Sequence, residues 1–102
     1  LGVTAAKRLA IVPDIPAIAE TVPGFNADTW NGIMAPRGTP RAIIMKIQSV
    51  IAQALQQAET REKLYAQGGE PSGSTPEQFG EFMAQESARY AKLIKDANIK
   101  AE

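Results

Sequence analysis

The chain has 102 residues, of which 44% are hydrophobic and 22% are charged. This length allows one domain or part of one, and the apolar content is too high for a disordered chain. Eleven basic residues balance eleven acidic ones, which argues against non-specific binding to nucleic acid or anionic membranes, because both need a basic excess. The sequence has no cysteine and no histidine. Disulfides, Ser-His-Asp triads, Cys-His dyads and metal sites with such ligands are therefore excluded within it.

The sequence begins with Leu1, and its first residues read as a strand already under way. Residues 1–6 are small, apolar and partly β-branched, which predicts an extended strand. No signal peptide is visible, and no stretch reaches the roughly 18 apolar residues that a membrane span needs. We expect the chain to be a fragment whose targeting segment lies upstream.

Prolines restrict the conformation of the next two segments. Residues 9–24 contain three of them, which exclude a long helix because each removes an N–H donor and restricts the preceding residue. A short helical turn is predicted at 16–20, with Pro16 at its first position and Asp14 as its cap. Residues 25–36 alternate between two faces and predict a second strand, which ends before Pro36.

A long amphipathic helix is predicted over residues 40–57. Thr39 and Pro40 form a start signal, with a hydroxyl at the N-cap and proline at the first helical position. Apolar residues then recur at spacings of three and four, as a helix with one buried face requires. They are Ile43, Ile44, Ile47, Val50, Ile51, Ala54 and Leu55.

Two further helices follow. A short one is predicted over 59–67 and ends at Gly68 and Gly69, since glycine suits the left-handed residue after a helix. A second is predicted from Pro76 to residue 97 or 98, with Thr75 at the N-cap and Gln78 closing a capping box. Its apolar stripe comprises Phe79, Phe82, Met83, Tyr90, Leu93, Ile94 and Ala97.

These elements predict a helix-rich α/β chain with too few strands for a complete sheet. The long helices have wide apolar faces, whereas the strands are few and short, and an isolated pair of strands is marginal in water. We therefore infer that part of the sheet is missing from this chain. Either the rest of a larger domain supplies it, or another copy of the chain does.

Without histidine and cysteine, the chemistry left to the chain is that of carboxylates, lysines, hydroxyls and backbone. Nothing in the spacing of Asp14, Glu20 and Asp28 holds two carboxyl groups together, so we interpret them as a helix cap and solvated charges. The loop at 35–40 lacks the glycine spacing and Lys-Ser/Thr pair of a phosphate loop. We predict no catalytic residue, no metal site and no cofactor.

Two further positions each have a functional and a structural interpretation. Trp30, next to Thr29, could line a ligand cleft, but a lone aromatic residue in a strand is more often part of a core. Glu86 lies on the edge of the last apolar stripe, three residues before Arg89 and four before Tyr90. We interpret it as a partner in a structural ion pair or hydrogen bond.

The order and spacing of the short motifs resemble one protein family. They are VPDIPAIAE at 12–20, VPGF at 22–25, WNGIMAP at 30–36, Gly-Thr-Pro at 38–40, LYAQGGEP at 64–71, TPEQF at 75–79, ESARY at 86–90 and NIK at 98–100. This succession resembles the C-terminal third of Bug-type receptors, the extracytoplasmic substrate-binding proteins of tripartite tricarboxylate transporters. Three departures are Ala17 for the usual Thr, Asn98 for the usual Gly, and a shortened stretch at 20–22.

The resemblance implies part of a two-lobed, periplasmic-binding-protein-like fold. Residues 1–24 would be the last strand and proline-rich loop of the second lobe. Residues 25–36 would cross between the lobes, and residues 37–102 would form the helical closing part of the first lobe. The main ligand-gripping loops would lie upstream, which leaves Thr29 and Trp30 as substrate-binding candidates at the cleft edge or hinge.

The resemblance also implies a periplasmic, non-enzymatic receptor. Its partners would be a small carboxylate and the subunits of a membrane transporter, with no nucleic acid. An alternative is a stand-alone α/β interaction module that forms homo-oligomers, specifically dimers through its apolar helix faces, because large apolar patches mark interfaces. A small enzyme is disfavoured by the absence of His and Cys.

Overall fold

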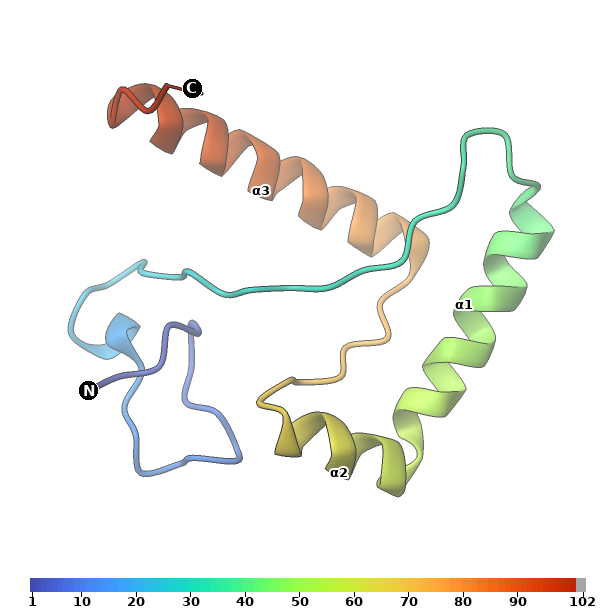
Figure 1. The fold of residues 1–102 in the computed structure, drawn as a ribbon, viewed down its shortest axis with the longest axis horizontal. Helices are drawn as coiled ribbons and strands as arrows, with labels where there is room; N and C mark the ends of the chain where they lie inside the picture. The colour runs from blue at the N-terminus through green and yellow to red at the C-terminus, as the bar shows by residue number, and fades with distance from the viewer. Residues whose placement is uncertain (101–102) are drawn as a thin grey trace. The chain divides into compact units, whose positions relative to one another are not determined.

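The computed structural model describes residues 1–100, so the last two residues of the region expected over 37–102 lie outside the description. A 3₁₀ turn, η1 (Ile18–Glu20), precedes three helices (Figure 1). They are α1 (Arg41–Gln56), α2 (Ala58–Ala66) and α3 (Pro76–Asp96). All three predicted helices are confirmed to within one or two residues at their ends, as expected from their periodic apolar positions and glycine stops.

The chain divides into two compact units. The first comprises Leu1–Arg37 and Ala58–Glu70, and the second comprises Gly38–Gln57 and the chain from Pro71 onward. Helix α2 therefore belongs with the irregular N-terminal segment, whereas α1 and α3 belong together. In the described part of the chain, no helix combines the length and apolarity that crossing a membrane requires.

The two predicted strands are wrong as regular elements. Within residues 1–100 the pairing is limited to one isolated parallel bridge, between Val3 and Ala17. The Val3 N–H donates to the Pro16 carbonyl at 2.9 Å, and the Ile18 N–H donates to the Val3 carbonyl at 3.0 Å. Residues 4–7 then bend, and the segment 25–36 runs extended without being assigned as a strand (Figure 1). A strand needs a neighbour along its length, and β-propensity alone cannot supply one.

The start of α1 differs from the prediction by one position. Pro40 occupies the N-cap with φ −56° and ψ 134°, and no side chain caps the helix there. The φ of proline suits the residue just outside a helix as well as the first one inside it. Thr39 and Pro40 therefore each lie one position further from the helix than predicted. The Pro40 carbonyl still accepts the first helical bonds, from the N–H groups of Ile43 and Ile44 at 3.0 and 3.2 Å.

The predicted signals at the end of α2 and the start of α3 are confirmed. Gly68 has φ +79°, and the Gly69 N–H donates to the Leu64 carbonyl at 2.9 Å, which is the Schellman arrangement. At α3, the Gln78 N–H donates to Thr75 Oγ1 at 3.2 Å, while Gln78 Oε1 accepts from the Thr75 N–H at 2.9 Å. This reciprocal pair is the capping box that the sequence predicts.

The C-terminal end of α3 explains one departure from the family pattern. Asn98 has φ +51° and is the one non-glycine residue with positive φ among those described. The Ile99 N–H donates to the Ile94 carbonyl at 3.0 Å, which closes a second Schellman arrangement. Asparagine tolerates the left-handed conformation better than other side chains do, so it can stand where relatives are expected to have glycine.

In the second unit, the segment after Pro71 packs closely on α1. A Cβ atom on Gly73 would lie 3.6 Å from Leu55 Cδ1 and 3.7 Å from Ala52 Cα. Gln48 Nε2 makes long hydrogen bonds to the carbonyls of Gly73 and Ser74, at 3.5 and 3.4 Å. Helices α1 and α3 also contact each other, and Arg41 forms an ion pair with Glu77 at the start of α3.

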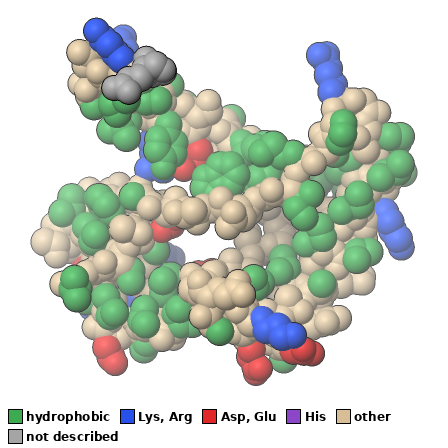
Figure 2. All heavy atoms as spheres, in the orientation of Figure 1, with side chains coloured by type: hydrophobic (Ala, Val, Ile, Leu, Met, Phe, Trp, Pro, Cys, Tyr) green, Lys and Arg blue, Asp and Glu red, His purple; other side chains and the backbone are tan. Residues whose placement is uncertain are grey.

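Very little of this chain is buried. Among the described residues, the core is limited to Ala17, which is 2% exposed. Large apolar side chains remain open on both long helices, and Figure 2 shows them along α1 as green spheres. A folded domain normally buries most of its large aliphatic side chains, since that burial is the main favourable term in folding. The apolar faces of these helices are therefore only partly covered within the described chain.

Candidate functional site

The candidate residues Thr29 and Trp30 lie in the extended segment of the first unit. The Ala27 N–H donates to the Thr4 carbonyl at 3.1 Å, and Asn26 Oδ1 accepts from the Asp28 N–H at 3.3 Å. The second bond forms an Asx turn just before the candidates. Both candidates are exposed in this chain, Trp30 by 37%, so Trp30 is not a core residue of the chain.

The N-terminal segment is paired on both sides at this point. Val3 bonds to the loop around Ala17, while the next residue, Thr4, bonds to Ala27. The N-terminal segment therefore contacts two other segments, one through the Val3–Ala17 bridge and the other through a single hydrogen bond. That single bond holds the backbone two residues before Thr29.

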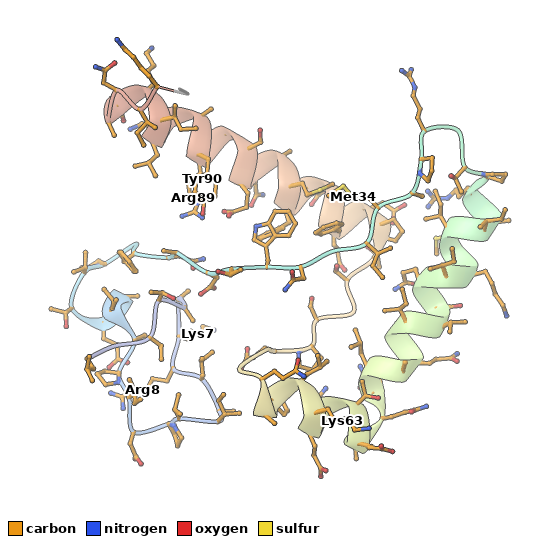
Figure 3. All side chains as sticks on the ribbon, in the orientation of Figure 1. Lys7, Arg8, Met34, Lys63, Arg89 and Tyr90 are labelled. Atoms are coloured by element: carbon orange, nitrogen blue, oxygen red, sulfur yellow. The ribbon has the colours of Figure 1, made fainter. Side chains whose placement is uncertain are left out.

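A charged cluster fixes the proline-rich loop in the same unit. Arg8 donates to the Glu20 carboxylate through Nε and Nη2, both at 2.8 Å, and its Nη1 donates to the Pro13 carbonyl at 3.1 Å. Glu20 Oε1 also accepts the Ala17 N–H at 2.9 Å. Figure 3 shows Arg8 within this N-terminal loop. The cluster therefore ties both ends of the loop to its middle.

The electrostatics of the cluster follow from these bonds. Hydrogen bonding to Arg8, and then to the Ala17 N–H, lowers the pKa of Glu20 to about 2. The same carboxylate raises the pKa of Arg8. Both side chains are nearly half exposed, so the pair is a local positioning device and adds little to global stability.

The proline-rich loop differs from its sequence prediction in two details. A helical turn does form there, but Ala17 is its N-cap, so the expected cap at Asp14 is wrong. Glu20 was expected to be a solvated charge, whereas it is the acceptor at the centre of the cluster. Glu20 follows Arg8 by twelve residues, and no short-range periodicity links two positions across the two intervening prolines.

The second unit holds the other charged cluster. Arg89 donates to both carboxylate oxygens of Glu86 at 2.8 and 2.7 Å, which confirms the interpretation of Glu86 as a structural ion-pair partner. The Arg89 guanidinium lies 4.8 Å from the centre of the Tyr90 ring, within cation–π range, and both side chains project from the same side of α3 (Figure 3). Glu86 raises the pKa of Arg89.

Neither cluster has the form of a catalytic centre. Each carboxylate is neutralised by an arginine, and lowering the pKa of Glu20 removes its usefulness as a proton acceptor near neutral pH. Over residues 1–100, no group of three or more acidic residues could hold a metal ion. The arrangement suits the positioning of loops and helices.

Comparison with known proteins identifies the family. Residues 1–99 match the model described as "Tripartite tricarboxylate transporter family receptor". The chain belongs to this receptor family. The resemblance in the sequence motifs is therefore confirmed along nearly the whole chain.

Individual relatives give the scale of the match. The receptor chain is 35% identical over 103 residues to a UPF0065 protein from the tcbD-tcbE intergenic region of Pseudomonas sp. strain P51, covering 99% of the chain and 31% of the relative. It is also 35% identical over 101 residues to Protein BugT of Bordetella pertussis, covering 98% of the chain and 31% of that protein. The chain thus spans about a third of the length of these relatives.

A solved structure matches the fold. "R. palustris Rpa4515 with adipate" superposes with a TM-score of 0.82 at 36% identity, covering 96% of the receptor chain and 33% of that protein. The receptor chain therefore has the fold of a helix-rich part of the two-lobed, periplasmic-binding-protein-like receptors, with an incomplete sheet, as the sequence predicts. The missing strand neighbours and the open helix faces are consistent with a chain that matches one third of such a protein.

Proposed function

We propose that this chain is the C-terminal part of a solute receptor that binds a small carboxylate in the periplasm and delivers it, chemically unchanged, to a tripartite membrane transporter. The observation that carries the proposal is the family match over residues 1–99. Its agreement in fold with a protein solved with adipate supports a carboxylate as the ligand class.

The division of labour within the receptor is part of the proposal. Residues 1–24 belong to the second lobe, residues 25–36 cross between lobes, and residues 37–102 close the first lobe. Small anions are commonly held by helix N-termini and backbone N–H groups, and we assign those groups mainly to the receptor outside this chain. Within the chain, Thr29 and Trp30 form the edge of the cleft or its hinge.

Calorimetry of the full-length receptor with a panel of mono-, di- and tricarboxylates, adipate included, tests the ligand class. We expect saturable binding of at least one acid with one site per receptor. The 102-residue chain alone should give no binding heat with the same acids, because it provides at most one wall of a cleft. Absence of binding to the full-length receptor by every acid in the panel would refute the proposal.

Cell fractionation tests the location. The full-length receptor should leave the cells with the periplasmic fraction on gentle osmotic release, together with a periplasmic marker enzyme. Retention with a cytoplasmic marker would contradict the transport role, since a receptor must meet its ligand outside the inner membrane.

A further inference from the structure

The chain contains three asparagines, which differ in the residue that follows each of them. The three pairs are Asn26–Ala27, Asn31–Gly32 and Asn98–Ile99. The main-chain nitrogen of the following residue can attack the asparagine side chain and close a five-membered ring. Glycine has no Cβ, so it obstructs this attack least and leaves the backbone most free to rotate into the required geometry. The sequence therefore makes Asn31–Gly32 the most reactive of the three pairs.

The structure restrains Asn26. The Ala27 N–H, whose nitrogen would attack the Asn26 side chain, donates to the Thr4 carbonyl at 3.1 Å. The Asn26 side chain is itself engaged, since its Oδ1 accepts the Asp28 N–H at 3.3 Å. Both hydrogen bonds must open before the ring can close, and local opening has a free-energy cost.

Asn98 is restrained at the end of α3. The Ile99 N–H donates to the Ile94 carbonyl at 3.0 Å, as part of the second Schellman arrangement. Isoleucine is also β-branched, so its side chain crowds the main-chain nitrogen that would have to attack. The backbone and the following side chain therefore both oppose ring closure at Asn98.

Asn31 lacks these restraints in the described chain. Asn31 and Gly32 are both exposed, and they lie in the extended segment that ends at Pro36. Over residues 1–100, neither the Gly32 N–H nor the Asn31 side chain takes part in a hydrogen bond. Rotation of the main chain can therefore bring the two reacting atoms together without first breaking a hydrogen bond.

We propose that Asn31 is a site of spontaneous deamidation in the receptor. The Gly32 nitrogen loses its proton to solvent and forms a bond to Asn31 Cγ. The Cγ–Nδ2 bond breaks, and the side-chain amide leaves as ammonia, which gives a cyclic succinimide. Water then opens the ring. Breaking the bond from nitrogen to Cγ gives aspartate, whereas breaking the bond from nitrogen to the main-chain carbonyl carbon gives isoaspartate.

Both products change the segment that we propose to cross between the lobes. Each replaces a neutral amide by a negative charge. Isoaspartate also adds its Cβ atom to the main chain, so the side chains on either side of residue 31 no longer alternate as they do along a strand. The reaction itself needs only this segment and water, so it does not depend on the proposed function.

Peptide mapping of the full-length receptor tests the proposal. The receptor is incubated without ligand at physiological temperature over a series of pH values, and an unincubated sample is subtracted. Trypsin releases residues 9–37, which contain Asn26 and Asn31, and residues 96–100, which contain Asn98. Fragment mass spectra locate each replacement of an amide NH₂ by OH. Isoaspartate methyltransferase then labels the rearranged product.

Asn31 should deamidate at least about tenfold faster than Asn26 or Asn98, because a hydrogen-bonded N–H reacts only after local opening. The rate at Asn31 should rise with pH, since the attacking nitrogen must lose its proton. A rate at Asn31 no higher than the rates at the other two asparagines would overturn the proposal. The mapping uses no ligand, so its result is independent of whether any carboxylate binds.

Two variants identify the reacting pair. Gly32→Ala should slow the reaction severalfold, because the added Cβ obstructs the attack. Gly32 is not among the described glycines with positive φ, so alanine is not strained there. Asn31→Gln should abolish the methyltransferase labelling of residues 9–37, because its longer side chain would have to close a larger ring. Labelling of that peptide at the original rate in either variant would also contradict the assignment.

Discussion

Arg8 holds Glu20 through two parallel hydrogen bonds of 2.8 Å, one to each carboxylate oxygen. The residues are twelve apart, and three prolines stiffen the chain between and just after them. Because the same carboxylate accepts the Ala17 N–H, one side chain fixes both the loop and the start of η1. Ala17 is the buried residue of the described chain and the bridge partner of Val3. The ion pair is therefore the positioning element of the first unit.

This geometry makes the loop sensitive to acid. The pKa of Glu20 is lowered to about 2, whereas an unfolded glutamate titrates near 4.3. A carboxyl whose pKa is depressed in the folded state contributes stability above its unfolded pKa, and that contribution is lost as the pH falls through the folded value. Following the Glu20 side-chain carbon by NMR should therefore show a midpoint near pH 2, with loss of the Val3–Ala17 bridge signals over the interval from about 4.3 to 2.

Removing the Arg8 guanidinium tests whether this specific partner lowers the pKa of Glu20. In Arg8→Met, the Glu20 midpoint should move up toward the ordinary glutamate value, because the largest source of the lowered pKa is gone. Lys7→Met removes the neighbouring positive charge and should leave the midpoint almost unchanged. If both substitutions moved the Glu20 midpoint equally, the lowered pKa would come from the positive charge of the region and not from the hydrogen bonds of Arg8.

The cap of α3 can be tested at a single hydroxyl. Thr75→Ala removes the acceptor for the Gln78 N–H and should weaken the helix by about 1 kcal/mol. We expect lower helical circular dichroism at 222 nm, restored by Thr75→Ser. Ser72→Ala, which removes a hydroxyl from the connector before the helix, is the control. Full helicity in Thr75→Ala would show that Pro76 and the macrodipole suffice to start α3.

Two glycine substitutions should act in opposite directions. Gly68 has φ +79°, so Gly68→Ala forces an L-residue into the left-handed region and should destabilise the end of α2 by about 1 kcal/mol. Gly80 lies inside α3, and an added Cβ would meet nothing within 4 Å. Gly80→Ala should therefore raise helicity, by about 0.5–1 kcal/mol of helix stability. Circular dichroism that falls for both would contradict the assignment of Gly80 to an open helix position.

Trp30 is the one tryptophan of the chain and offers an optical test of the proposed cleft edge. Adding a carboxylate that binds the full-length receptor should change the tryptophan fluorescence emission of the receptor. This change should be absent from the Trp30→Phe variant. The same substitution should weaken binding by a factor of a few, since an aromatic wall contributes mainly contact area. An unchanged emission difference in Trp30→Phe would remove Trp30 from the cleft.

The sequence predicts the helices of this chain well, because their information is local. The capping box at Thr75 and the stop at Gly68 depend only on neighbours within a few residues. The predicted strands at 1–6 and 25–36 fail as regular elements, because a strand depends on partners that can lie anywhere in the chain or outside it. The family could still be identified, since its turn and cap motifs survive in order.

The two charged clusters also differ in whether local sequence predicts them. The Glu86–Arg89 pair could be predicted, as the residues are three apart on one helix. The Arg8–Glu20 pair could not, because only the path of the proline-rich loop brings the two together. Thr29 and Trp30 are candidates because an aromatic residue beside short polar side chains can line a cleft, and because the family resemblance implies a hinge or cleft edge there. The structure places both in an exposed extended segment.

Scanning calorimetry of the 102-residue chain tests the central claim, which is that the rest of a receptor buries the apolar faces of its helices. With the core of the described residues limited to Ala17, the chain should melt gradually, without a cooperative heat-absorption peak. A self-sufficient domain of this length would instead unfold in one sharp transition with an enthalpy of about 70 kcal/mol, equal to its van't Hoff value. That second result would contradict the account.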